Sequence, residues 1–172
     1  MADSTPPGAH PSPAPSSPSD AGDAPAGDEQ ACSIAATLAV IGDRWTLLIL
    51  RDIFRGVRRF SPLREDLGIA RNLLADRLAK LVEHGVLEKV AYQDRPVRHE
   101  YRLTPKGADL STALIALMGW GDRWYAAGGP PTVLVHHGCG TPLEQSVRCP
   151  SCGDPVNPGS IRSRPGPGRS TT

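Results

Sequence analysis

One uninterrupted stretch, from Phe60 to Gly107, constrains the fold of this 172-residue chain more than any other. Its apolar side chains recur at helical spacing on both sides of Gly68, which favours a short helix, a turn and a second helix over residues 70–84. A pattern typical of two short strands follows, and then a further helix. The stretch therefore predicts a mainly α fold with a small β wing, the winged helix-turn-helix.

The two helices of this stretch carry start and stop signals. Ser61-Pro62 is typical of a cap and a first helical position, so the short helix is predicted over 63–67, with Phe60 on an extended piece before it. The second helix lacks a capping side chain because Ala70 stands at its start, and Gly85 is placed as its stop. Its inward face is predicted to hold Leu74, Leu78, Leu81 and Val82.

The hairpin after the second helix is rich in Val, Tyr and Leu. Two strands are predicted, over 87–93 and 98–103, joined by residues 94–97. Basic side chains on such a wing can reach the phosphates of a duplex that lies against the second helix.

Helices are also predicted on either side of this unit. Ser33 is placed as the cap of a helix ending near Ile41, and another runs over 43–56. After the hairpin, Thr104-Pro105 opens a long helix to about Ala127. Its apolar stripe is wider than one small domain covers, so it is expected to pack against a second copy of the chain. The stripe consists of Leu110, Leu114, Leu117, Gly121 and Trp124, widened by Ile115, Met118 and Trp120.

Proline and charge are unevenly distributed along the chain. Residues 1–30 hold seven prolines, five acids and no Lys or Arg, and residues 157–172 are mostly Pro, Gly, Ser and Arg, so both are predicted to be disordered. Residues 30–127 carry fifteen Lys or Arg against eleven Asp or Glu, an excess that favours a nucleic-acid partner. No stretch has the length and apolarity of a membrane span and no secretory signal pattern is present, so a cytoplasmic protein is expected.

Three separate motifs occur in an order typical of one family. They are AVIGDRWTLLILR at 39–51, RFSPL at 59–63 and PVRHEYRLTPKG at 96–107. Together they resemble the HxlR family of bacterial winged-helix regulators over about residues 32–128. The resemblance implies a transcriptional regulator that binds double-stranded DNA as a homodimer through its outer helices. We expect a repressor acting on a palindromic operator. One departure is Ala70, where the family usually has Ser.

The start of the second helix carries the candidates for reading DNA sequence. Arg71 and Asn72 are assigned to base edges, because Arg pairs with guanine and Asn with adenine through two hydrogen bonds each. Leu73 and Arg77 flank this polar face and belong to the predicted DNA-binding set.

Three basic residues are assigned to phosphates, which fixes register but reads no sequence. They are Lys80, Arg95 and Arg98. Asp76 lies among them, and two interpretations are open. It accepts a hydrogen bond from a cytosine amine, or it forms an ion pair with Lys80 four residues on, and the ion pair is favoured.

Two short motifs near the C-terminus share the order ligand, two residues, Cys, Gly. They are HHGCG at 136–140 and CPSCG at 149–153. Two such turns place four donors around one ion, as tetrahedral zinc requires. We therefore expect one Zn²⁺ per chain in a zinc-knuckle or ribbon-like segment over 130–156, with ligands His136, Cys139, Cys149 and Cys152. His137 is an alternative to His136, and the rival interpretations are a thiol–disulfide pair or an unmetallated tail.

Cys32 stands alone just before the first helix. The favoured interpretation is a small buried apolar residue. The alternative is a thiol at a helix N-terminus that senses oxidants or electrophiles, which would make the regulator responsive to a redox or small-molecule signal.

Other classes of function have weaker support in the sequence. No catalytic Ser-His-acid set, phosphate-binding glycine loop or helical zinc-protease motif is present, so no enzyme is predicted. A thiol–disulfide activity would have to use Cys149 and Cys152. A zinc-dependent protein-interaction module is the remaining alternative.

Overall fold

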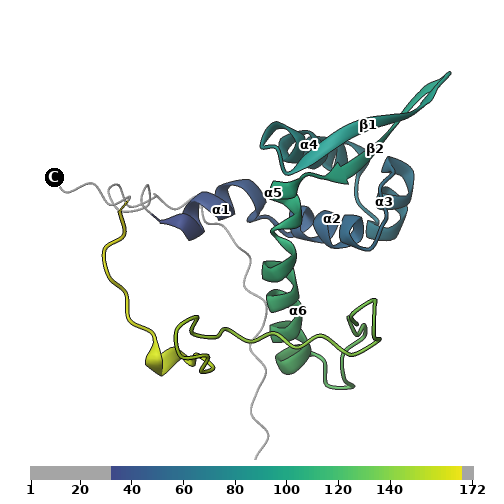
Figure 1. The fold of residues 1–172 in the computed structure, drawn as a ribbon. Helices are drawn as coiled ribbons and strands as arrows, with labels where there is room; N and C mark the ends of the chain where they lie inside the picture. The colour runs from purple at the N-terminus through teal and green to yellow at the C-terminus, as the bar shows by residue number, and fades with distance from the viewer. Residues whose placement is uncertain (1–31, 168–172) are drawn as a thin grey trace, which may run out of the picture.

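The computed structural model describes residues 32–167, so the disorder predicted for residues 1–30 lies outside the described residues (Figure 1). Helices predominate, and a two-stranded antiparallel sheet forms the wing. The elements in chain order are α1 (Ser33–Ile41), α2 (Arg44–Phe54), α3 (Phe60–Leu67), α4 (Arg71–Glu83), β1 (Leu87–Asp94), β2 (Val97–Leu103), α5 (Pro105–Ala108), α6 (Ser111–Tyr125) and the 3₁₀ turn η2 (Pro158–Ser160). The predicted winged helix-turn-helix is confirmed.

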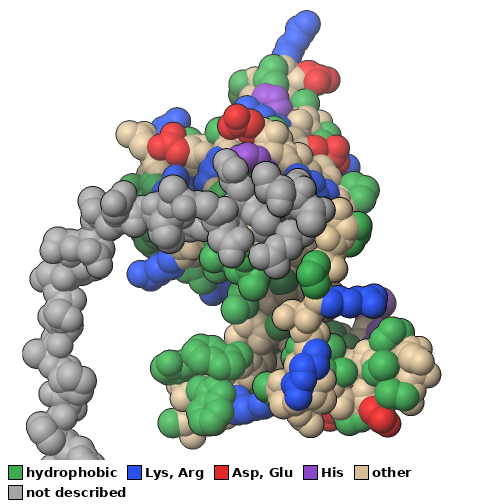
Figure 2. All heavy atoms as spheres, turned by 90° about the vertical axis from the view of Figure 1, so that its left-hand side faces the viewer, with side chains coloured by type: hydrophobic (Ala, Val, Ile, Leu, Met, Phe, Trp, Pro, Cys, Tyr) green, Lys and Arg blue, Asp and Glu red, His purple; other side chains and the backbone are tan. Residues whose placement is uncertain are grey.

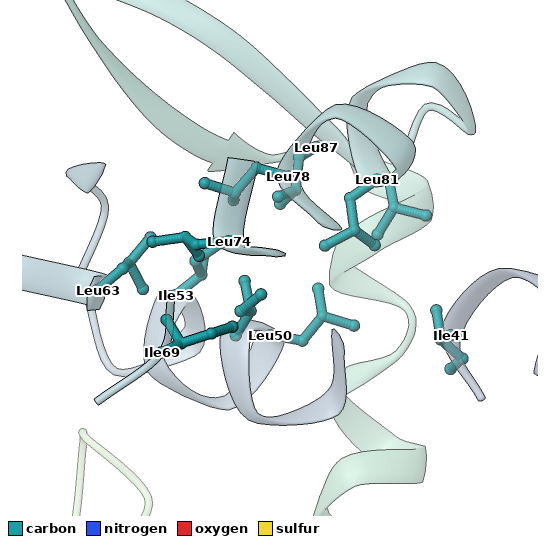
Figure 3. Close-up of a cluster of buried hydrophobic side chains, with 11 residues drawn as sticks. Ile41, Leu50, Ile53, Leu63, Ile69, Leu74, Leu78, Leu81 and Leu87 are labelled. Carbon is teal, nitrogen blue, oxygen red and sulfur yellow. The ribbon is translucent and has the colours of Figure 1, made fainter. Parts of the chain in front are cut away.

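The core lies between α2, α3 and α4 and is closed by the start of β1 (Figure 3). Its members are Ile41, Ile49, Leu50, Ile53, Leu63, Ile69, Leu74, Leu78, Leu81, Val86 and Leu87. Each of the larger ones contributes about 1.5–3 kcal/mol through burial. The inward face predicted for α4 is confirmed at Leu74, Leu78 and Leu81, whereas Val82 is half-buried.

Two helix starts differ from the prediction by a few residues. Cys32, and not Ser33, is the N-cap of α1, because its carbonyl accepts the Ala36 amide at 3.0 Å. In α3, Phe60 is already helical, and the extended piece lies just before it. The Arg58 carbonyl accepts a hydrogen bond from the Tyr101 amide at 2.8 Å, and Arg59 forms an isolated antiparallel bridge with Glu100 of β2. The helix begins at the next residue.

The single long helix predicted after the wing is wrong: the chain forms α5 and then α6. Gly107 lies so close to the Val86 carbonyl that an added Cβ would overlap its oxygen. Thr104 Oγ1 accepts from the Gly107 amide at 3.1 Å and donates to the Gly85 carbonyl at 2.7 Å. The Leu110 amide then bonds to the carbonyl three residues back, at 3.2 Å, and this tightening separates the two helices.

The wing is a regular hairpin with one irregularity. Its strands pair from Leu87 opposite Leu103 to Asp94 opposite Val97, and the register shifts between Ala91 and Gln93. The connection is therefore shorter than the predicted 94–97. The strands project well beyond the body of the molecule (Figure 1).

α6 extends away from the body in the opposite direction to the wing (Figure 1) and holds no buried residue. The segment that follows it passes across α6, and Gln145 Nε2 donates to the Thr112 carbonyl at 3.4 Å. A cavity of about 160 Å³ separates α6 from this segment, with Met118, Val133 and Leu143 among its lining residues. The turn η2 falls inside the stretch predicted to be a disordered tail.

No single helix within residues 32–167 has the length and apolarity to cross a membrane. α1 and α2 reach the required length and apolarity only when they are taken together, and the chain bends by 79° between them.

Candidate nucleic-acid interface

The first turn of α4 presents two exposed polar side chains. Arg71 and Asn72 have no side-chain hydrogen bond or ion pair within the part of the chain that the structure describes. Ala70 is the N-cap and provides no side-chain bond, as predicted. The first backbone amides of α4 are therefore left for solvent or an anion, as is usual where an uncapped helix begins.

Two members of the predicted DNA-binding set make contacts within the protein. Leu73 is half-buried and packs against the core. Arg77 Nε donates to Asp43 Oδ1 at 3.0 Å, which ties α4 to the start of α2. The two residues are separated by 34 positions in the chain, so local spacing gave no signal for the pair.

The predicted ion pair between Asp76 and Lys80 is wrong. Lys80 Nζ donates to the Ala39 carbonyl at 2.7 Å, which joins α4 to α1. The Lys80 side chain can reach the Ala39 carbonyl because α1 packs beside α4. Asp76 is exposed, without a hydrogen bond or ion pair inside residues 32–167.

The wing carries exposed cations at its far end. Arg95 lies in the turn and Arg98 on β2, and both side chains are exposed and unpaired among the described residues. A basic side chain accordingly projects at the tip of the wing (Figure 2). Arg102 differs, because Glu100 holds it in an ion pair.

A further contact joins the wing to the helix-turn-helix, beside the backbone contacts of residues 58 and 59 with β2, and it was not predicted. The guanidinium of Arg59 lies over the ring of Tyr92, 4.2 Å from its centroid. Such a cation–π contact contributes about 0.5–1 kcal/mol at an exposed site. It adds to the backbone contacts that hold the wing beside the start of α3.

The C-terminal motifs form two separate pairs of donors. His136 Nδ1 lies 3.2 Å from Cys139 Sγ. Hydrogen bonds from the hydroxyl and amide of Thr141, and from His136, lower the pKa of the Cys139 thiol. The backbone amide of Cys152 is the main cause of a lowered pKa at Cys149. The structure does not bring the two pairs together: no three His, Cys, Asp or Glu side chains within residues 32–167 are grouped as metal ligands.

Cys32 is exposed, so the interpretation as a buried apolar residue is wrong. Its thiol stands at the N-cap of the nine-residue helix α1.

A helix-turn-helix with an exposed polar start to its second helix, next to a basic wing, defines the class of winged helix-turn-helix DNA-binding proteins. The chain matches the HxlR-like helix-turn-helix family model over residues 40–128. It is similar to the HTH-type transcriptional regulator Rv3095 of Mycobacterium tuberculosis, itself described as uncharacterised. The two are 46% identical over 137 residues, which cover 79% of this chain and 87% of that protein.

Solved structures share the fold. PA1607, described as a candidate transcription factor, is 38% identical with a TM-score of 0.72, covering 80% of this chain and 96% of that one. The redox regulator HypR in its reduced form is 27% identical with a TM-score of 0.51, covering 54% of this chain and 92% of that one. The chain belongs to the HxlR-like helix-turn-helix family and is a transcriptional regulator of HTH type.

Proposed function

We propose that this regulator is a repressor that binds a palindromic operator as a homodimer. The exposed, unpaired start of α4 carries the proposal: Arg71 and Asn72 would enter the major groove, while Arg95 and Arg98 hold phosphates beside it. A dimer bound to promoter DNA prevents RNA polymerase from binding the same base pairs. Repression therefore needs no activity beyond DNA binding, and most of this chain is a DNA-binding unit.

The apolar faces of α1 and α6 support a second copy of the chain as the partner. Both tryptophans on α6 are exposed, Trp120 by 56% and Trp124 by 66%, and Ile34 on α1 is exposed by 70%. Hydrophobic side chains gather in the lower half of the molecule, where α6 lies (Figure 2). A helix with this much exposed apolar surface and no buried residue favours an apolar partner in water, and a two-fold interface would cover both copies at once.

The test is selection from a library of random double-stranded oligonucleotides. We expect enrichment of two inverted half-sites, with centres about 10–10.5 base pairs apart or a multiple of that spacing. Run-off transcription from a promoter carrying the selected site should then fall as protein is added. Absence of any inverted pair would contradict the dimer, and a rise in transcript would contradict repression.

A second candidate function is a response to oxidants through Cys32. The thiol is exposed at the start of α1, and a redox regulator, HypR, shares the fold. In this proposal the Cys32 thiolate attacks a hydroperoxide, one oxygen passes to sulfur to give a sulfenic acid, and the peroxide is reduced to water or an alcohol. Because Cys32 adjoins the proposed dimer surface at the start of α1, the added polar group would weaken the dimer and release DNA.

The matched test compares the wild-type chain with Cys32→Ser. Peroxide should release DNA from the wild-type chain and leave the variant bound. If both are released alike, Cys32 is not the sensor. A Cys139→Ser variant serves as the control for oxidation at the C-terminal thiols.

A further inference from the structure

Two short segments after α6 are copies of one backbone structure, although they differ in sequence. We call residues 135–142 the first knuckle and residues 148–155 the second knuckle. Each is closed at its ends by an isolated antiparallel bridge, Val135 with Pro142 and Arg148 with Pro155. His136 corresponds to Cys149, and Cys139 to Cys152, at a constant offset along the chain.

Two backbone hydrogen bonds occur at equivalent positions in both knuckles, whereas the bond from the Cys139 amide to the His136 carbonyl, at 3.3 Å, belongs to the first knuckle alone among the described residues. Across the base, the His136 amide donates to the Thr141 carbonyl at 2.8 Å, and the Cys149 amide donates to the Asp154 carbonyl at 3.0 Å. Within the turn, Gly140 donates to the His136 carbonyl at 2.8 Å, and Gly153 donates to the Cys149 carbonyl at 2.9 Å.

The glycine after the last donor has the same special conformation in both knuckles. Gly140 has φ 72° and Gly153 has φ 76°, in the left-handed region that other residues rarely adopt. This glycine follows the last donor and lets the chain turn back to close the bridge at the base of the knuckle. The repeated geometry at two sites with different sequences indicates a shared requirement, which a loop serving only as a linker would not have.

The donors of the first knuckle are already spaced as two ligands of one ion. In a tetrahedral zinc site, Zn–S of about 2.3 Å and Zn–N of about 2.0 Å place sulfur and nitrogen roughly 3.5 Å apart. His136 Nδ1 and Cys139 Sγ are 3.2 Å apart. His137 has no such contact with a cysteine in residues 32–167, so the geometry selects His136 over its neighbour.

Neither knuckle is a complete site, because structural zinc takes four protein ligands and each knuckle offers two. In the structure they lie on either side of α6, joined by residues 143–147 (Figure 1). The ends of this connection bond within the segment itself, Leu143 to Leu134 and Val147 to Val156, at 2.8 Å each. The hydrogen bond from Gln145 to α6 is long, 3.4 Å, so the polar contact between the connection and α6 is weak. The nearby apolar side chains remain exposed, Val133 by 56%, Val135 by 50% and Val147 by 65%, so the segment has almost no core of its own.

We propose that one Zn²⁺ joins the two knuckles of a single chain and folds this segment. Its ligands are His136 Nδ1 and the thiolates of Cys139, Cys149 and Cys152. The connection folds back, the thiol protons pass to solvent, and metal binding supplies the free energy that the missing core cannot. This assignment is independent of the proposed repressor function, since it concerns no DNA-contacting residue.

The test starts with the full-length chain, purified under reducing conditions and analysed for bound metal. We expect one zinc per chain. Replacement by Co²⁺ should give the visible bands of tetrahedral cobalt and a charge-transfer band from three thiolates. Absence of zinc, and no uptake of added Zn²⁺ or Co²⁺, would overturn the proposal.

Variants then identify the ligands. Cys139→Ser and Cys152→Ser should each lose the metal, His136→Cys should retain it with a fourth thiolate band, and His137→Ala and Cys32→Ser should retain it unchanged. Helical circular dichroism reports whether α1 to α6 stay folded in each variant. Retention of full zinc by Cys139→Ser, or loss in His137→Ala with unchanged helicity, would overturn the ligand set.

A mixing experiment tests whether the ligands come from one chain. Cys139→Ser damages the first knuckle and Cys152→Ser the second, so neither variant offers four ligands within a chain. A refolded mixture of the two should therefore stay free of zinc. Zinc bound by the mixture would show that a first knuckle pairs with a second knuckle of the partner, and the single-chain site would be wrong.

Discussion

Arg77 Nε donates a hydrogen bond to Asp43 Oδ1 over 3.0 Å and so ties the middle of α4 to the first turn of α2. The same carboxylate accepts the Trp45 and Thr46 amides, each at 3.1 Å, and the Thr46 hydroxyl at 2.6 Å. One side chain thus caps α2 and positions the helix proposed to read DNA. Asp43 belongs to the motif at 39–51 that carries the family resemblance, and its role is to position α4.

Replacing Asp43 by Ala should therefore lower the free energy of unfolding by about 1–2 kcal/mol, as expected for a lost N-cap. Arg77→Ala should cost less than about 1 kcal/mol, because both side chains of this pair are about one-third exposed and solvent screens it. Urea unfolding followed by circular dichroism measures both. Asp76→Ala, an exposed acid on the same helix without a partner in residues 32–167, is the control and should change stability by less than about 0.5 kcal/mol.

The same site makes stability depend on pH. Burial raises the pKa of Asp43, but hydrogen bonds from the side chain and amide of Thr46 and the contact with Arg77 outweigh it, so the pKa lies below the ordinary 3.8. A lowered folded-state pKa stabilises the protein above the unfolded value, and this contribution is lost as pH falls through the folded-state pKa. Asp43→Asn retains a capping oxygen without the charge. The stability difference between wild type and Asp43→Asn should therefore shrink below pH 3.8, and a difference that stays constant down to pH 3 would contradict the assignment.

The sequence predicted the elements of the DNA-binding unit well because their signals are local. Helical spacing located Leu74, Leu78 and Leu81 inside α4, and turn residues located Gly68 and the wing. The misplaced features depend on contacts between distant segments. Lys80 donates to the Ala39 carbonyl, 41 positions away in the chain. The spacing of residues within α4 could not indicate that this bond would replace the predicted ion pair with Asp76. The break between α5 and α6 likewise arises from a backbone contact between the turn after α4 and Gly107.

Gly107 should accordingly be intolerant of substitution. A Cβ there would overlap the Val86 carbonyl oxygen, which is backbone and cannot rotate away. Gly107→Ala should lower the melting temperature and separate α5 from the start of β1. Gly119→Ala is the matched control on α6, since nothing lies within 4 Å of its added Cβ, and it should raise stability by up to about 1 kcal/mol. Equal melting temperatures for the two variants would show that the contact at Val86 does not limit the fold.

The proposed division between phosphate and base contacts predicts two different defects. Arg98→Ala should weaken binding to every DNA sequence alike and lower the slope of log affinity against log salt by about 1 per subunit, which is about 2 for the dimer. Asn72→Ala should instead relax preference at one base position, by about 1–3 kcal/mol. Fluorescence anisotropy with the selected operator and with single-base variants distinguishes them. For a dimer that neutralises about 6–10 phosphates, wild-type affinity should fall about 10³–10⁵-fold between 50 and 200 mM salt. Identical behaviour of the two variants would show that the division is wrong.

The proposed dimer rests on the exposed apolar surface of α1 and α6, so a charge placed there should separate the copies. Leu117 is 54% exposed on α6, next to the turn that carries Trp120. Leu117→Arg would place a guanidinium in the interface of both copies at once, where its burial without a partner is costly. Sedimentation equilibrium should then show a monomer at concentrations where the wild-type chain is a dimer. Affinity for the full palindrome should drop towards that for a half-site, while circular dichroism stays unchanged because the core between α2 and α4 is not touched.

Glu88→Arg introduces the same side chain on β1 and serves as the control. A variant Leu117→Arg that remains a dimer would place the interface elsewhere on the molecule.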